Sequence, residues 1–127
     1  MSKNIERIRR AMYLNEIVQK LDLTVLTNHK DFSELEVKSG YCSDLLSCVM
    51  TGASAEGIWV TLMAHGNIVA VAALLDLTAI LITEDAQPDQ DTIDKANDKN
   101  VIILSTPKSN FHVCGELWDL GILAPQN

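Results

Sequence analysis

The chain of 127 residues is long enough for one compact domain with a hydrophobic core and too short for two independent ones. Hydrophobic residues make up 47% of the chain but aromatic residues only 5%, which favours layered helices and sheets over an aromatic-rich sandwich. The formal net charge is −7, and because an acidic domain repels phosphate backbones, the composition argues against a nucleic-acid partner.

The N-terminal residues 1–12 are rich in basic side chains and carry Ile5 and Ile8 three positions apart, which predicts a helical extension ahead of a domain formed by residues 13–127. Beyond it, hydrophobic periodicity predicts helices and strands that alternate along most of the chain. The predicted elements are a helix over 13–21, strands over 23–27 and 36–42, a helix over 44–51, a strand over 58–62, a helix over 67–76, a strand over 78–83, a helix over 89–99, a strand over 101–104 and a helix over 109–120.

Two of these strand segments, 79–82 and 101–104, are continuously apolar, as burial on both faces of a parallel sheet requires. Short loops between successive strands and helices imply right-handed crossovers and a parallel core of at least three strands. Ser43 is placed to cap the helix over 44–51, and Gly52 lies just past its predicted end. The sequence therefore predicts a single compact α/β domain with a mainly parallel sheet.

The cysteines are three in number and have no CxxC spacing, which speaks against both a disulfide framework and a zinc cluster. We therefore predict that Cys42, Cys48 and Cys114 are small buried hydrophobic residues of a reduced, cytoplasmic protein. The charged start of the chain does not resemble a signal peptide. The longest apolar region, 68–82, contains Asp76 and is shorter than the roughly 20 residues of a membrane-spanning helix, so no membrane partner is expected.

Ligands of parallel α/β sheets bind beyond the carboxyl ends of the strands, where helix N-termini present free amides. Three such ends lie at residues 63–67, 83–88 and 105–109. If they converge, they surround one crevice with hydrogen-bond donors, a cation and a histidine that changes charge near neutral pH. Ordinary helix starts use the same residue types, so capping alone is the alternative interpretation. The candidate ligand-binding residues are His65, Asn67, Thr83, Ser105, Thr106, Lys108 and Asp44.

His65 is the strongest single candidate for a functional residue. The alternative is a structural histidine that is hydrogen-bonded to a backbone carbonyl. Nucleophilic catalysis would need Ser43 or Cys42 to meet His65 and Asp44, and nothing in the spacing supports that assembly. The chain contains neither GxSxG nor the GxGxxG and GxxxxGK[ST] phosphate loops, and no histidine pair has metal-ligand spacing. We therefore expect no catalytic residue, no cofactor and no metal site.

Residues from about 14 to 123 resemble the DRTGG domain, a small α/β module found alone or fused in phosphotransacetylases and in CBS-pair pyrophosphatases. In this sequence Glu34 and Leu35 stand where the family has Asp-Arg, and residues 38–40 stand for Thr-Gly-Gly. A ligand contact made by the family's arginine is therefore not carried over. The segments that carry the resemblance are 37–46 (VKSGYCSDLL), 58–61 (IWVT), 65–72 (HGNIVAVA), 80–83 (ILIT) and 104–107 (LSTP).

The resemblance implies a non-catalytic regulatory or sensing module that forms a homodimer. The resemblance does not fix a ligand, and we expect this module to bind a small anionic metabolite or nucleotide at the carboxyl-terminal ends of the strands. Trp59, Val60, Met63 and the small-residue helix over 67–76 are candidates for the dimer interface or, equally, for the core. Two alternatives stay open. One is a small enzyme that acts on a phosphorylated or acyl substrate with His65 as acid or base, and the other is a ligand-free adaptor for a partner enzyme.

Overall fold

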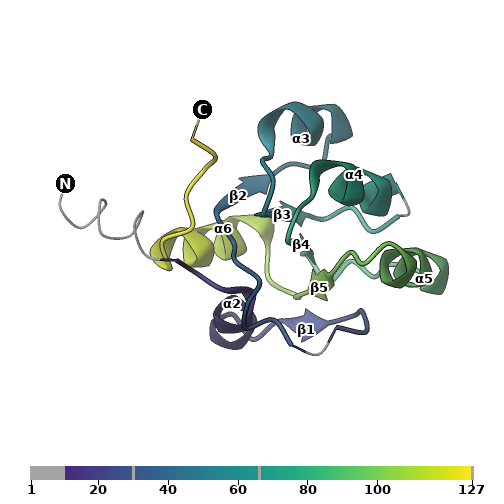
Figure 1. The fold of residues 1–127 in the computed structure, drawn as a ribbon, viewed down its shortest axis with the longest axis horizontal. Coiled ribbons are helices and arrows are strands. Elements are labelled where there is room, and N and C mark those ends of the chain that lie inside the picture. Colours follow the sequence, from purple (N-terminus) through teal and green to yellow (C-terminus); the bar gives the residue numbers. More distant parts are fainter. Residues whose placement is uncertain (1–10, 30, 66, 127) are drawn as a thin grey trace.

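The structure is a computed structural model that describes residues 11–29, 31–65 and 67–126. Of the predicted N-terminal extension, residues 1–10 lie outside the described residues. A five-stranded sheet forms the centre of the molecule, and helices cover both of its faces (Figure 1). In chain order the elements are α2 (Leu14–Lys20), β1 (Thr24–Val25), β2 (Ser39–Cys42), α3 (Leu46–Gly52), β3 (Gly57–Thr61), α4 (Asn67–Leu75), β4 (Ala79–Ile82), α5 (Gln90–Asp98), β5 (Ile103–Ser105) and α6 (Asn110–Asp119).

The strands lie in the order β1-β5-β4-β3-β2, with β2 to β5 parallel and the short β1 antiparallel to β5. Val60 is in register with Leu81, which is in turn in register with Leu104. All residues of β3 and β4 are buried, because helices cover both faces of the central strands. The predicted α/β fold with a mainly parallel sheet is therefore confirmed.

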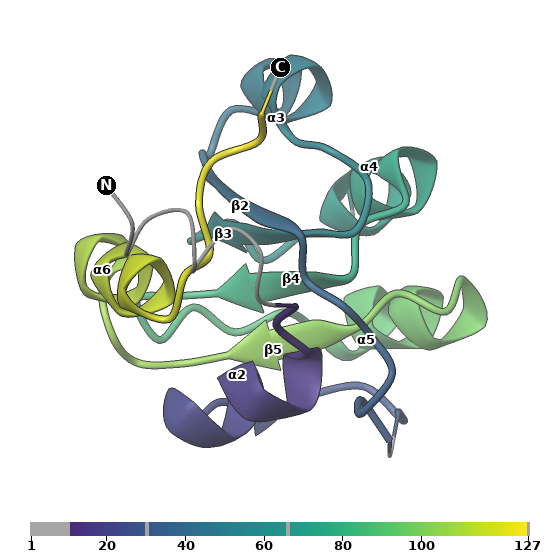
Figure 2. The same cartoon turned by 60° about the vertical axis from the view of Figure 1, so that its left-hand side comes forward.

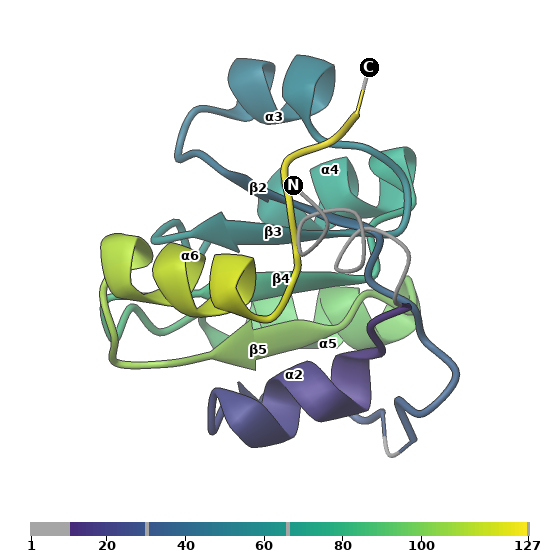
Figure 3. The ribbon, with the colours of Figure 1, turned by 90° about the vertical axis from the view of Figure 1, so that its left-hand side faces the viewer.

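Two hydrophobic cores lie on opposite faces of the sheet. Figures 2 and 3 show α2 and α6 over one face, and α4 and α5 over the other. On the first face Leu14 and Leu117 pack with Leu81 and Leu104, whereas on the second Ile68 packs with Ile80. Removal of each such side chain from water contributes about 2 kcal/mol to folding.

Four helices end in the same way, with one residue in the left-handed region followed by a backbone N–H that donates to a carbonyl five residues earlier. At the end of α4, for example, the Leu77 N–H donates to the Ala72 carbonyl oxygen at 3.1 Å. Only the last of these endings, a glycine after α6, was expected from the sequence. The residues with positive φ are Asp22, Asp76, Asn100 and Gly121.

The start of α3 corrects one prediction. Ser43 does not cap this helix, which begins at Leu46, and the Ser43 hydroxyl instead accepts a hydrogen bond from the Leu45 N–H at 3.1 Å. Gly52 is the last residue of the helix rather than the residue after it, and a side chain there would collide with the ring of Tyr41. The helix starts late because the preceding loop is bonded to the end of β3.

The predicted burial of the cysteines is also wrong. Cys42 and Cys48 are exposed and Cys114 is half-buried. Cys42 ends an edge strand, so no further strand covers it on that side. Trp59 and Val60, by contrast, are buried in the two cores on opposite faces of the sheet, which removes both from the candidates for a dimer interface.

The C-terminal segment after α6 runs alongside β2 (Figures 2 and 3). Ile122 is buried in the core on the α6 side, and the Gly40 N–H donates to the Leu123 carbonyl oxygen at 2.8 Å. This segment therefore supplies a backbone partner to the outer side of β2.

Among the described residues, no helix is both long and apolar enough to cross a bilayer.

Candidate functional site

The carboxyl ends of β2, β3, β4 and β5 meet at one edge of the sheet, because these four strands are parallel. The backbone continues to pair beyond the strands: the Thr83 N–H donates to the Thr61 carbonyl oxygen, and the Thr106 N–H to the Ile82 carbonyl oxygen, both at 3.0 Å. The strand ends that the sequence singled out are therefore neighbours, as expected from the parallel sheet.

Asp44 connects two of these ends. One of its carboxylate oxygens accepts hydrogen bonds from the Thr61 hydroxyl at 2.7 Å and from the Leu62 N–H at 2.9 Å. The Thr61 hydroxyl oxygen in turn accepts a hydrogen bond from the Met63 N–H at 3.1 Å. Asp44 therefore fixes the turn after β3 and does not lie in the first turn of α3 as predicted.

Thr83 joins the end of β4 to the start of α6. Its hydroxyl is fully buried and lies within hydrogen-bonding distance of the Asn110 side-chain oxygen and the Thr61 carbonyl oxygen. The Glu84 carboxylate accepts a hydrogen bond from the Asn110 N–H at 2.9 Å, and the Glu84 N–H donates to the Lys108 carbonyl oxygen at 2.8 Å. These bonds satisfy the buried polar groups of this loop from within the protein.

Glu84 and Asp85 both lie in the left-handed region, with φ of 60° and 58°. The positive-φ residues at the helix ends belong to a common C-terminal capping geometry. Glu84 and Asp85 follow strand β4 instead, so helix capping does not account for their conformation. Two successive non-glycine residues in this conformation carry a cost of about 1 kcal/mol each or more, and such strain is concentrated at functional loops. The neighbouring Asp89 caps α5, with its carboxylate accepting from the Thr92 N–H at 2.9 Å.

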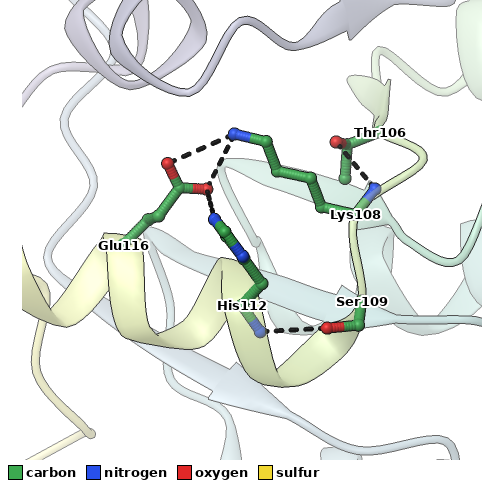
Figure 4. Close-up of polar contacts among 5 residues, drawn as sticks. All are labelled: Thr106, Lys108, Ser109, His112 and Glu116. Carbon is green, nitrogen blue, oxygen red and sulfur yellow. Dashed lines mark hydrogen bonds and ion pairs between the residues drawn. The ribbon is translucent and has the colours of Figure 1, made fainter.

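A cluster of charged side chains lies on α6 and the loop before it (Figure 4). The Lys108 Nζ lies 3.0 and 3.2 Å from the two carboxylate oxygens of Glu116, and the His112 Nε2 lies 3.5 Å from one of them. Ser109 caps the helix by accepting from the His112 N–H at 3.2 Å, which fits the alternative interpretation of this strand end as an ordinary helix start. The charges of Lys108 and Glu116 cancel within this cluster.

His65 and Asn67 lie elsewhere, in a groove of about 750 Å³ between α4 and α5. Both side chains are exposed at the beginning of α4, and the opposite wall carries Lys95 and Lys99. The Lys95 Nζ lies 3.2 Å from a carboxylate oxygen of Asp91, in an ion pair open to solvent. Val69, Ala70 and Ala73 form the remaining walls.

The structure thus divides the predicted set of site residues. His65 and Asn67 share the groove, whereas Thr83, Ser105 and Thr106 are buried and Lys108 is paired with Glu116. Whether any of them binds a ligand stays a prediction. Among the described residues, no three His, Cys, Asp or Glu side chains come together as a metal site would require.

Sequence reasoning missed the two lysines of the groove. Lys95 and Lys99 are four residues apart, which places them on one side of a helix. That spacing was a usable signal, but a polar helix gives no indication of which neighbour its charged side faces. The pairing of α5 with α4 follows from the strand order, in which β4 lies between β3 and β5.

The fold defines a class of protein: one α/β domain with a DRTGG-like fold, in which four parallel strands and one antiparallel strand lie between two layers of helices. No family model matches the sequence, and no curated protein sequence matches it. A solved structure with a similar fold contains the CBS and DRTGG domains of the regulatory region of Clostridium perfringens pyrophosphatase, complexed with the activator diadenosine tetraphosphate.

That similarity has a TM-score of 0.68 at 15% sequence identity, and it covers 96% of this chain and 57% of the other. At such low identity the likeness concerns the fold alone. It confirms the DRTGG-like fold implied by the sequence segments that resemble the family.

Proposed function

We propose that the protein is a non-catalytic regulatory module that binds a small anionic metabolite or nucleotide in the groove between α4 and α5. The observation that carries the proposal is that Lys95 and Lys99 line the same groove as His65 and Asn67, which lie at the start of α4. In a chain with a net charge of −7, this groove combines Lys99, Lys95 in its solvent-open ion pair with Asp91, and the N-terminus of α4, which together favour negative charge.

The shape and lining of the groove support a ligand with both an anionic and an apolar part. Its volume of about 750 Å³ is in the range of small-molecule sites. Ala70 and Ala73 have small side chains, so the floor beside the lysines is apolar and open. A nucleotide or an acyl phosphate would direct its phosphate to Lys95, Lys99 and His65 and its remaining part to the alanines.

The test is a thermal-shift series on the full chain with ATP, ADP, acetyl phosphate and coenzyme A, with adenosine as the uncharged comparison. A ligand that binds only the folded state raises the melting temperature. We expect an anionic probe to do so, and the double change Lys95→Ala and Lys99→Ala to abolish the shift. Lys20→Ala, on the opposite face of the sheet, is the matched control and should keep it.

We further propose that the module works as a homodimer, and α6 supports this. Phe111 and Trp118 lie seven residues apart on one side of that helix and are 91% and 55% exposed. Large exposed aromatic side chains are characteristic of protein interfaces. Phe111→Glu should convert a dimer to a monomer in light scattering. Leu74→Glu, at an exposed apolar position on α4, tests the other candidate interface, and a monomer in that variant alone would move the interface to α4.

The exposed side chains of Phe111 and Trp118 on α6 also favour the alternative of a ligand-free adaptor for a partner enzyme. The thermal-shift and light-scattering experiments distinguish the adaptor from the ligand-binding dimer. A flat thermal-shift series together with a monomer at micromolar concentrations would favour the adaptor, in which Phe111 and Trp118 contact another protein.

A further inference from the structure

Two of the three cysteines lie against each other where α6 crosses β2. Cys42 is the last residue of β2, in register with Val60, whose side chain belongs to the core on the α6 side of the sheet. Cys114, in the second turn of α6, packs against that same core. Both line one apolar cavity of about 160 Å³, at the place where α6 packs against β2.

The pleat of β2 indicates that the Cys42 side chain points towards α6. Side chains two residues apart on a strand point to the same face. Gly40 is on the α6 side, because a Cβ built there would lie 3.1 Å from the Cγ2 of Ile122. Tyr41, between them, packs into the core of the opposite face. Cys42 therefore projects towards α6, as Gly40 does.

We propose that Cys42 and Cys114 form a reversible disulfide that ties α6 to β2, with a low-molecular-weight disulfide such as oxidised glutathione as the oxidant. One cysteine thiolate attacks a sulfur of the oxidant, whose S–S bond breaks and releases one glutathione thiolate. The second cysteine then loses its proton to solvent and attacks the mixed disulfide, which releases the second glutathione. Two electrons pass from the cysteine sulfurs to the oxidant.

The environment of the two thiols sets the order of attack. Although Cys42 is exposed as a residue, the partial burial of its thiol, followed by the neighbouring Cys114, raises the pKa of that thiol to about 12. A thiol with that pKa is almost entirely protonated at neutral pH, so the first attack is placed at Cys114.

The experiment incubates the folded full chain with oxidised glutathione, denatures it in acid and counts free thiols by alkylation and mass spectrometry. We expect the count to fall from three to one, with a peptide that links Cys42 to Cys114. Dithiothreitol should restore all three. The oxidised protein should also melt at a higher temperature, because the cross-link restricts the unfolded chain.

Three variants make the assignment specific. Cys48→Ser, at the exposed cysteine on α3, should still lose two thiols. Cys42→Ser and Cys114→Ser should each form no intramolecular link, and oxidation should leave their melting temperatures unchanged. Three free thiols after treatment, glutathione retained on Cys114 as a stable mixed disulfide, or a link that includes Cys48 would each overturn the proposal.

Discussion

The carboxylate of Asp44 accepts a hydrogen bond from the hydroxyl of Thr61 at 2.7 Å, and this bond holds the loop after β2 against the end of β3. The same oxygen accepts from the Leu62 N–H, so one side chain organises the turn that leads towards α4. The consequences of this bond, and of four other features, can be measured.

Replacing Asp44 by Ala should lower the free energy of unfolding by about 1–3 kcal/mol, because the Thr61 hydroxyl and the Leu62 N–H lose a charged acceptor. Asp44→Asn keeps an oxygen at the same position and should cost less. Urea unfolding followed by circular dichroism measures both. Equal stability of the Ala variant and the natural protein would show that water replaces the carboxylate without cost.

Replacing Leu81 by Ala should lower the free energy of unfolding by about 2–5 kcal/mol, since this side chain is 0% exposed and a cavity would remain in the central strand. Leu74→Ala is the matched control, because Leu74 is 69% exposed. We expect less than about 0.5 kcal/mol for it. Similar losses for the two variants would contradict the assignment of β4 to the centre of the fold.

His65→Ala separates a functional histidine from a structural one. The side chain is exposed, so we expect the free energy of unfolding to change by less than about 0.5 kcal/mol. The thermal shift produced by an anionic probe should fall in the same variant. A lower melting temperature without any probe would instead make His65 structural, and lost turnover of an acyl phosphate would favour the enzyme alternative.

Asp89 should make stability depend on pH in the acid range. Hydrogen bonds from the backbone and side chain of Thr92 lower the pKa of this carboxyl in the folded protein. Its contribution is therefore present in full above the unfolded pKa of about 3.9 and is lost as the pH falls through the lower folded pKa. Melting temperatures between pH 6 and pH 2 should fall less steeply for Asp89→Ser, which retains a cap, than for the natural protein. Parallel curves would rule out this linkage.

Cys42 should react with iodoacetamide more slowly than Cys48 in the folded, reduced protein. Partial burial of the thiol and the neighbouring Cys114 raise the pKa of Cys42, and the thiolate is the reactive form. Peptide mapping after timed alkylation near pH 8 gives the two rates. In urea the difference should disappear, and a difference that persists would have to come from the local sequence rather than from the fold.

Much of the fold was predictable because its strongest signals are local. The continuous apolar runs in β4 and β5 indicated buried parallel strands, and Ser109 with Gly121 marked both ends of α6. The errors arose where a tertiary bond overrides a local preference. Asp44 has the residue type of a helix first turn, but its bond to Thr61 takes it out of the helix.

The candidate site was less predictable than the fold. Parallel strands placed the polar strand ends side by side, as expected, but the sequence does not show which of these side chains pair internally. Lys108 is neutralised by Glu116, two turns further along the chain, and Thr83 is buried against Asn110. The two lysines opposite His65 come from a helix whose position depends on the strand order, which is a property of the whole chain.

The C-terminal segment beside β2 has a consequence for association. An open edge strand offers unpaired backbone groups with which a second sheet can pair, and this is a common route to aggregation. Here the Gly40 N–H is already bonded to the Leu123 carbonyl oxygen, and Ile122 anchors the segment in the core. Two copies could join their sheets through β2 only by first displacing this segment. Side-chain surfaces such as that of α6 are therefore open for self-association, whereas extension of the sheet at its β2 edge is blocked by residues 122–123.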